Sequence, residues 1–302
     1  MTSTTREIFD NYEIRKSKKQ KTAFIQWVTP VLEKVGYPVA VENGSFGARN
    51  IVIGDVKTAS VIYTAHYDTC AVMPFPNFIT PKSILIYILY QLLICIPIFA
   101  LIGLGTWLAS LIDPAFALLG YWVSFLAVMG VMTCGPANKH TANDNTSGTT
   151  AIIDLALAMP EELRGKAAFV LFDLEESGLL GSSSFASRHK QEMKEKLLVN
   201  LDCVSDGETM LFVLKKGAHK HLHLLKEVFT DSDSVKADFA TKGYVYPSDQ
   251  ANFKCGVGVA SLKKTKGGLL YMDKIHTARD TVYREENIAY LVDGCIRLTE
   301  KV

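Results

Sequence analysis

The sequence predicts an α/β fold with a mixed, largely parallel central sheet, helices on both faces of the sheet, and an inserted pair of apolar helices. Two observations lead to this prediction. Strand-like apolar segments alternate with helix-like segments along most of the chain, which is typical of a sheet covered on both faces. Two long runs without a charged residue interrupt this alternation between residues 83 and 138.

The individual elements follow from apolar runs, periodicity and turn residues. The strand candidates are residues 50–54, 60–66, 166–174, 196–202, 209–216 and 256–263. The helix candidates are one or two helices within residues 1–28, and residues 147–159, 182–196, 221–230 and 286–301. Because the apolar runs join a strand end to a helix start, we expect one domain from residues 1–82 and 139–302, with residues 83–138 as an insert.

The insert is long enough to cross a bilayer twice. Residues 83–110 and 115–138 contain no charge, and a spanning helix needs about 20 apolar residues. Soluble helices usually carry a polar stripe, so a transmembrane hairpin is favoured over a buried core hairpin. Trp107, Tyr121 and Trp122 lie near the inner ends of the two runs, where an interfacial aromatic belt is expected.

Three residues of the first run bear on its shape and packing. Pro97 is expected to kink the helix. Gly103 and Gly105 are expected to permit close packing. A hydrophobic lid or a homodimer contact is the remaining alternative for the insert.

Flanking charges predict the orientation of the hairpin. Lys82 precedes the first run and Lys139 follows the second, whereas the linker between the runs has no Lys or Arg. The positive-inside rule therefore places both flanks in the cytoplasm. The N-terminal segment does not resemble a secretory signal, and six scattered cysteines without a Cys-x-x-Cys pair are typical of reduced thiols. We expect a multi-pass membrane protein with its larger domain facing the cytoplasm.

The overall charge excludes one class of partner. A formal net charge of +1 gives no electrostatic reason to expect nucleic-acid binding, and a hydrophobic content of 48% argues against disorder. The basic residues between Arg15 and Lys21 are most simply a solvated helix face. Contact with anionic lipid is the weaker alternative.

Glu175 and Glu176 form an unusual pair of adjacent acids. Two other pairs have ordinary explanations, since residues 161–162 lie in a polar link and residues 285–286 open an amphipathic helix. Only Glu175 and Glu176 end a strand-like apolar run, where like charges repel and lose solvation. A bound cation would explain this placement.

Further polar side chains stand at the expected ends of strands, where sites form in such sheets. They are His66, Asp68, Asp144, Asp202 and His276. Histidines and carboxylates together are a plausible ligand set for zinc. An aspartate can bridge two ions, and a remaining glutamate can act as general base on a metal-activated water. Asp68 shares a strand face with His66 and can orient its imidazole.

These motifs, taken together and in order, resemble those of the M28 family of zinc aminopeptidases. The resemblance covers residues ~50–283 apart from the insert. It rests on His66-x-Asp68, "DNTSG" at 144–148, "EESGLLGS" at 175–182, "NLD" at 200–202 and "HTARDT" at 276–281. The insert is the departure, because a short loop usually joins the first two motifs in the family, and it puts ordinary soluble peptides in question as substrates.

The resemblance implies a zinc-aminopeptidase (phosphorylase-like) fold and two Zn²⁺ ions, with Co²⁺ or Mn²⁺ as substitutes. Asp144 would bridge the ions, with His66 and Asp202 completing one ligand set. Glu176 and His276 would complete the other. Glu175 would be the general acid and base, and Asp68 would orient His66. The segment "SDQANF" would help to line the substrate pocket, and the candidates there are Tyr244, Tyr246, Asp249 and Phe253.

The predicted function is that of a membrane-associated dizinc metallopeptidase, an aminopeptidase acting on peptides with a free N-terminus. Three alternatives stay open. They are a single-zinc acyl transfer like that of glutaminyl cyclases, a non-catalytic binding protein on the same fold, and a dizinc hydrolase of N-acyl amino acids, for which the chain has no room for the usual lid domain. The hairpin would anchor the enzyme in the lipid bilayer, deliver a membrane-derived peptide, or mediate dimerisation.

Overall fold

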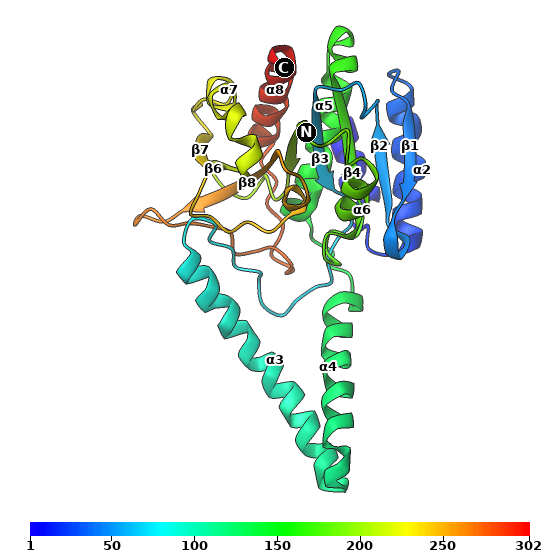
Figure 1. Ribbon diagram of the computed structural model, residues 1–302, viewed down its shortest axis with the longest axis vertical. Coiled ribbons are helices and arrows are strands. Elements are labelled where there is room, and N and C mark those ends of the chain that lie inside the picture. The colour runs from blue at the N-terminus through cyan, green and yellow to red at the C-terminus, as the bar shows by residue number, and fades with distance from the viewer.

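A nine-stranded mixed sheet forms the centre of the computed structural model, which describes residues 1–302 (Figure 1). The strand order is β1-β2-β4-β3-β5-β8-β6-β7, with β9 paired to β8. The strands are β1 (Val39–Asn43), β2 (Arg49–Ile53), β3 (Val61–His66), β4 (Ala167–Phe172), β5 (Leu197–Leu201), β6 (Thr209–Leu214), β7 (Lys236–Ala240), β8 (Gly256–Lys264) and β9 (Leu270–Tyr271). The predicted mixed α/β class is confirmed.

The parallel part of the sheet lies at its centre. Strands β4, β3, β5 and β8 run parallel to one another, as do β6 and β7. The pairs β1–β2, β2–β4, β6–β8 and β8–β9 are antiparallel. The sequence analysis missed β1, β7 and β9. β1 and β7 lie at the two edges of the sheet and are partly exposed, so they lack a buried apolar run.

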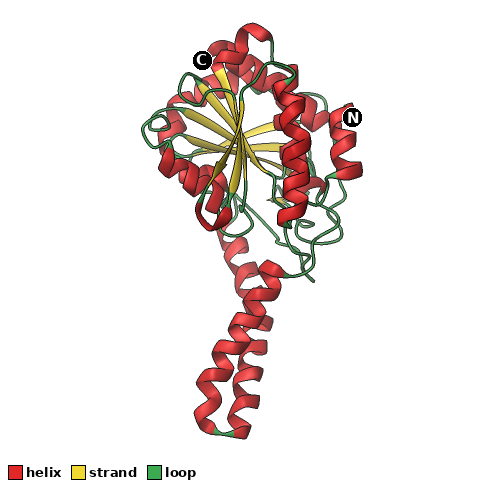
Figure 2. Ribbon diagram, turned by 90° about the vertical axis from the view of Figure 1, so that its right-hand side faces the viewer, coloured by secondary structure: helices red, strands yellow, loops and turns green.

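Helices cover both faces of the sheet (Figure 2). The helices are α1 (Ser3–Asn11), α2 (Lys18–Glu33), α3 (Ile84–Ile112), α4 (Ala117–Cys134), α5 (Gly148–Ala158), α6 (Leu180–Arg188), α7 (Leu222–Val228) and α8 (Glu285–Lys301). Successive strand side chains point to opposite faces. Tyr63 of β3 therefore packs in the core beneath α2, α5 and α8, whereas its neighbour Ile62 packs in the core that contains Phe185 of α6.

Helix α6 is shorter than the sequence predicts. The expectation was a helix over residues 182–196, but α6 ends at Arg188 and residues 189–195 form turns. Met193 is buried in the same core as Phe185. The chain bends there because it must return to the sheet at the start of β5.

Helices α3 and α4 form a hairpin that projects from the sheet domain, and they meet at their far ends (Figure 1). Both are long and apolar enough to cross a membrane, with mean hydropathies of 2.5 and 1.9 over their most apolar 18 residues. None of these residues is buried. Helix α3 continues through Pro97. Residues 67–83 connect β3 to the hairpin, and residues 135–143 connect the hairpin to Asp144.

Glycine residues let the two helices of the hairpin approach each other. A Cβ atom on Gly105 would lie 2.8 Å from Cβ of Ser124, and one on Gly120 would lie 2.5 Å from Cβ of Ala109. The expected contact at Gly105 is therefore present. Gly103 makes no such contact within the chain, since no atom lies within 4 Å of its Cβ position.

Candidate metal centre

His66 and Asp68 stand at the carboxyl end of β3 and are buried. The nearest oxygen to His66 Nδ1 is the backbone carbonyl of Asp68 at 3.1 Å, and the Asp68 carboxylate is 3.6 Å away. That carboxylate also accepts hydrogen bonds from the backbone N–H groups of Glu175 (3.0 Å) and Glu176 (3.3 Å). Asp68 therefore connects the end of β3 to the pair of glutamates that follows β4.

The first of two ligand clusters surrounds the other nitrogen of His66. Nε2 lies 3.3 Å from Oδ1 of Asp144 and 3.5 Å from Oδ1 of Asp202. The three residues come from the end of β3, the loop before α5 and the end of β5, and all three are buried. Their donor atoms lie within 4.8 Å of one another, close enough to hold one ion.

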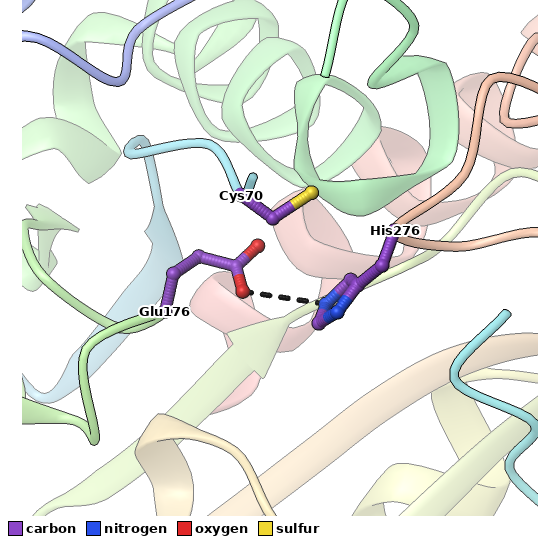
Figure 3. Close-up of side chains that lie close together, drawn as sticks. All are labelled: Cys70, Glu176 and His276. Carbon is purple, nitrogen blue, oxygen red and sulfur yellow. Dashed lines mark ion pairs between the residues drawn. The ribbon is translucent and has the colours of Figure 1, made fainter. Parts of the chain in front are cut away.

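The second cluster surrounds His276. Its Nε2 lies 3.0 Å from Oδ2 of Asp144 and 3.3 Å from Oε2 of Glu176. Figure 3 shows Glu176 and His276 facing each other, with Cys70 beside them. Asp144 thus presents one oxygen to each histidine, which is the arrangement that a bridging carboxylate requires.

Two further residues hold the Asp144 loop in place. Asp280 accepts hydrogen bonds from the backbone N–H groups of Asn143 (2.8 Å) and Asp144 (2.9 Å). The Asn145 side chain donates to the carbonyl of Leu201 at 3.0 Å, next to Asp202. Both residues belong to the sequence motifs, although the sequence predicts no role for either. Their positions in "DNTSG" and "HTARDT" were the available signal.

Backbone strain is concentrated at this centre. Leu174, Cys203 and His276 have φ values of 54°, 57° and 64°, although non-glycine residues rarely adopt the left-handed region. Leu174 directly precedes Glu175, and Cys203 directly follows Asp202. Such conformations persist where the surrounding structure enforces them, which is frequent at functional sites.

The protonation of the centre reflects burial and close charges. Burial opposes the charged form of both histidines, but nearby carboxylates, with Glu176 and Glu175 foremost, raise the pKa of His276 to about 9 and that of His66 well above its ordinary value. Burial raises the pKa of Glu176 to about 8 and that of Glu175 well above its usual range. Hydrogen bonds from both histidines outweigh burial and hold the pKa of Asp144 low. A cation would relieve this crowding of acids.

These residues fit a zinc centre by two criteria. Imidazole nitrogens and carboxylate oxygens are zinc ligands. In addition, Oε1 of Glu176 is buried and has no hydrogen-bond partner, which is costly unless something binds it. The unpaired oxygen belongs to one of the residues expected to hold the second ion.

A small cavity of about 80 Å³ lies over the centre. Glu175, Tyr246, Ile79 and Ile275 line it together with the ligand candidates. The Tyr246 hydroxyl donates to the carbonyl of Asp202 at 2.9 Å. Of the four expected pocket residues, Tyr246 is therefore the one that faces this cavity. The sequence analysis did not find Ile79 and Ile275, which reach the centre from the segments after β3 and after β9.

The other three expected pocket residues lie elsewhere. Phe253 is buried in the core beneath α6, stacked on Phe172 with ring centroids 5.9 Å apart. The Tyr244 hydroxyl donates to the carbonyl of Leu214 at 2.8 Å. Asp249 is buried, does not line the cavity, and accepts no hydrogen bond at either oxygen. Burial raises the pKa of Asp249 to about 7.

The sequence predicts that the N-terminal basic segment is a solvated helix face. The structure contradicts this prediction for two of its residues. Arg15 and Lys21 are buried. Arg15 Nε donates to the carbonyl of Tyr67 at 2.6 Å, and its terminal nitrogen donates to Oγ1 of Thr146 at 3.1 Å. Lys21 pairs with Asp173 at 2.6 Å. Arg15 therefore joins the chain after His66 to the loop that carries Asp144.

Comparison with known proteins adds a family and a fold. The sequence model described as Peptidase family M28 matches residues 126–290. No curated protein matches the chain.

Three solved structures resemble this one at low sequence identity. The Legionella pneumophila LapA aminopeptidase has a TM-score of 0.61 and 14% identity, over 99% of this chain and 68% of that chain. A glutaminyl cyclase from Porphyromonas gingivalis has a TM-score of 0.56 and 16% identity, over 98% of both chains. A leucine aminopeptidase precursor from Bacteroides thetaiotaomicron has a TM-score of 0.55 and 14% identity, over 99% of this chain and 94% of that chain. At these identities the similarities show a shared fold.

Proposed function

Because the chain belongs to peptidase family M28, whose members are hydrolases of the peptidase type, we propose that it is a membrane-associated dizinc aminopeptidase. The observation that carries the proposal is the position of Asp144. One of its oxygens lies 3.3 Å from His66 and the other 3.0 Å from His276. Two ligand clusters that share one carboxylate suit a pair of ions rather than one.

The proposed ligands form two sets, one for each ion, and Asp144 would belong to both sets. His66 and Asp202 would hold one ion, and Glu176 and His276 the other. When bound, zinc polarises the scissile carbonyl and lowers the pKa of a water molecule in the site. The unpartnered oxygen of Glu176 supports its place among the ligands.

Glu175 is the residue best placed to move the proton. Its carboxylate lies in a group with His66 and Glu176 whose donor atoms are within 4.8 Å of one another, and it lines the small cavity. It would take a proton from the water that attacks the peptide carbonyl carbon. It would then give that proton to the amine nitrogen as the C–N bond breaks. Burial, which raises its pKa, favours a group that accepts and returns a proton.

The size of the cavity favours action at the end of a chain. A volume of about 80 Å³ is far below the roughly 300–1,000 Å³ of ordinary ligand pockets. Such a space suits a terminal residue of a peptide better than the middle of a chain. For an aminopeptidase, that residue is the N-terminal one.

The hairpin would place the enzyme in a membrane. Large apolar side chains such as Leu85, Leu118 and Val131 are 67–69% exposed along α3 and α4, and exposed apolar surface of this extent requires a partner. A lipid bilayer fits helices of this length. Lys82 and Lys139 flank the hairpin, so we place the catalytic domain, residues 1–82 and 139–302, on the cytoplasmic side.

A peptide assay on the zinc-loaded, detergent-purified chain tests this function. We expect a peptide with a free N-terminus to lose its first residue, and the same peptide with an acetylated N-terminus to stay intact. Glu175→Gln serves as the inactive control. Loss of ammonia from an N-terminal glutamine without shortening of the chain would instead identify a cyclase. Cleavage of neither peptide by the metal-loaded protein would contradict the proposal.

A further inference from the structure

The last turns of α4 lie beside the metal centre. A cavity of about 200 Å³ is lined by Met129 and Met132 of α4 together with Glu176 and His276. Met73, from the chain that follows β3, also lines it. The hairpin is therefore part of the wall of the site as well as a projection from the domain.

This hairpin cavity, as we call it, adjoins the small cavity that Glu175 lines. Glu176 and His276 line both spaces. Figure 3 shows Cys70 beside these two side chains. Cys70 lines the hairpin cavity but not the small cavity. Two of the proposed metal ligands, Glu176 and His276, therefore share one cavity with Met129 and Met132.

Several polar groups in the wall of the hairpin cavity already have partners. Lys21 pairs with Asp173, and Lys16 donates to the carbonyl of Thr133 at 2.5 Å. The carboxylate of Asp68 accepts the backbone N–H groups that follow Leu174. The lining is mixed, and its three methionines provide an apolar part. Methionine side chains adapt to varied apolar shapes.

If the hairpin crosses a bilayer as proposed, the hairpin cavity would lie near the membrane surface. Met129 and Met132 are within the run 115–138 that contains no charge, and α4 ends two residues later at Cys134. Lys16, which contacts Thr133, marks the same level with a positive charge. Basic side chains at the end of a spanning helix are typical of the headgroup region on the cytoplasmic side.

We propose that the hairpin cavity receives one apolar side chain of a peptide substrate that lies at the bilayer surface, so that the hairpin selects substrates as well as anchoring the enzyme. This inference rests on the proposed aminopeptidase function. The volume of about 200 Å³ is below the roughly 300 Å³ at which pockets for whole ligands begin, which fits a single side chain. The substrate class is thus membrane-associated peptides with an apolar residue next to the cleaved bond.

Two matched peptides in lipid nanodiscs test the selection. They share the N-terminal residue and a C-terminal acyl chain, and differ by Leu or Ser at the second position. We expect the wild-type enzyme to favour the Leu peptide by roughly 10-fold or more in kcat/KM. In the double variant Met129→Ser, Met132→Ser we expect this preference to fall to near 1 through a higher KM, with kcat and metal content retained.

Val131 provides the matched control, because it lies in α4 and is 67% exposed but does not line the hairpin cavity. Val131→Ser should keep the preference for Leu. Equal cleavage of the two peptides by the wild type would overturn the inference, and so would an unchanged preference in the double variant. Both results would leave the aminopeptidase function standing, whereas cleavage of neither peptide would count against that function.

A binding measurement keeps the inference testable without turnover. A photoreactive residue at position 132 of the Glu175→Gln variant should crosslink to the Leu peptide, and the same residue at position 131 should not. Equal crosslinking at the two positions, or none at position 132, would contradict a substrate-filled hairpin cavity.

Discussion

The carboxylate of Asp68 accepts a hydrogen bond from the backbone N–H of Glu175 at 3.0 Å. The same carboxylate accepts the next N–H, that of Glu176, at 3.3 Å. Asp68 therefore holds the two adjacent glutamates through their backbone N–H groups. It does not bind either glutamate side chain. One side chain can then turn to a metal ion and the other to the reacting water.

Asp68→Asn tests this clamp. An amide has one acceptor oxygen where the carboxylate has two, and its NH₂ group would face another N–H donor. We expect kcat/KM to fall about 10–100-fold, the usual cost of losing an outer partner of a metal site, with the metal content unchanged. Asp238→Asn, which alters an exposed pair with Lys82, is the control. Wild-type kcat/KM in Asp68→Asn would rule out the clamp.

Glu175→Gln separates proton transfer from metal binding. The amide keeps the shape of the side chain but cannot accept a proton, so turnover should fall about 10²–10⁴-fold while metal stays bound. Glu176→Gln should instead lower the metal content, because Glu176 is a proposed ligand. Near-wild-type turnover in Glu175→Gln would refute its assignment as the general base.

Arg15→Met tests the support that lies beneath the centre. The guanidinium is fully buried and donates to the carbonyls of Tyr12 and Tyr67 and to Thr146. Leaving one such acceptor unpaired costs about 1–3 kcal/mol, so we expect a clear fall in Tm together with weaker metal binding.

Lys19→Met is the matched control for Arg15→Met, since Lys19 belongs to the same basic segment but is exposed. Its effect on unfolding should stay within about 0.5 kcal/mol. Equal Tm values for the two variants would show that Arg15 supports nothing essential.

A pair of glycine substitutions tests the packing of the hairpin. Leucine at Gly105 would collide with Ser124, whereas leucine at Gly103 points into open space. Forcing extra atoms into a packed contact costs typically about 1–3 kcal/mol. Gly105→Leu should therefore weaken disulfide crosslinking between cysteines introduced into α3 and α4, and Gly103→Leu should not. An equal effect of the two changes would contradict the observed pairing of the helices.

The sequence predicts the fold well where a physical pattern is local. The apolar composition of strands such as β3 and β4 predicts them directly, and the absence of charge predicts the long helices α3 and α4. The adjacent acids at the end of β4 pointed to a cation because no local role explains them. The sequence does not predict edge strand β1, because its residues are largely exposed and do not form an apolar run.

Contacts between segments far apart in the chain could not be predicted from the sequence. Arg15 and Lys21 look like ordinary surface cations, and only the folded chain shows that they meet Tyr67 and Asp173. Met132 likewise reads as one more apolar residue of a spanning helix. Its place in the same cavity lining as Glu176 depends on where the hairpin returns to the sheet.

The number of metal ions per chain tests the central claim most directly. Elemental analysis of the detergent-purified protein, after incubation with zinc and removal of the excess, should find two zinc ions in the wild type. Asp144→Ala should lose both, because each cluster depends on one Asp144 oxygen. A single ion in the wild type would contradict the dinuclear centre and favour cyclase-like chemistry. No zinc at all would contradict the metallopeptidase assignment itself.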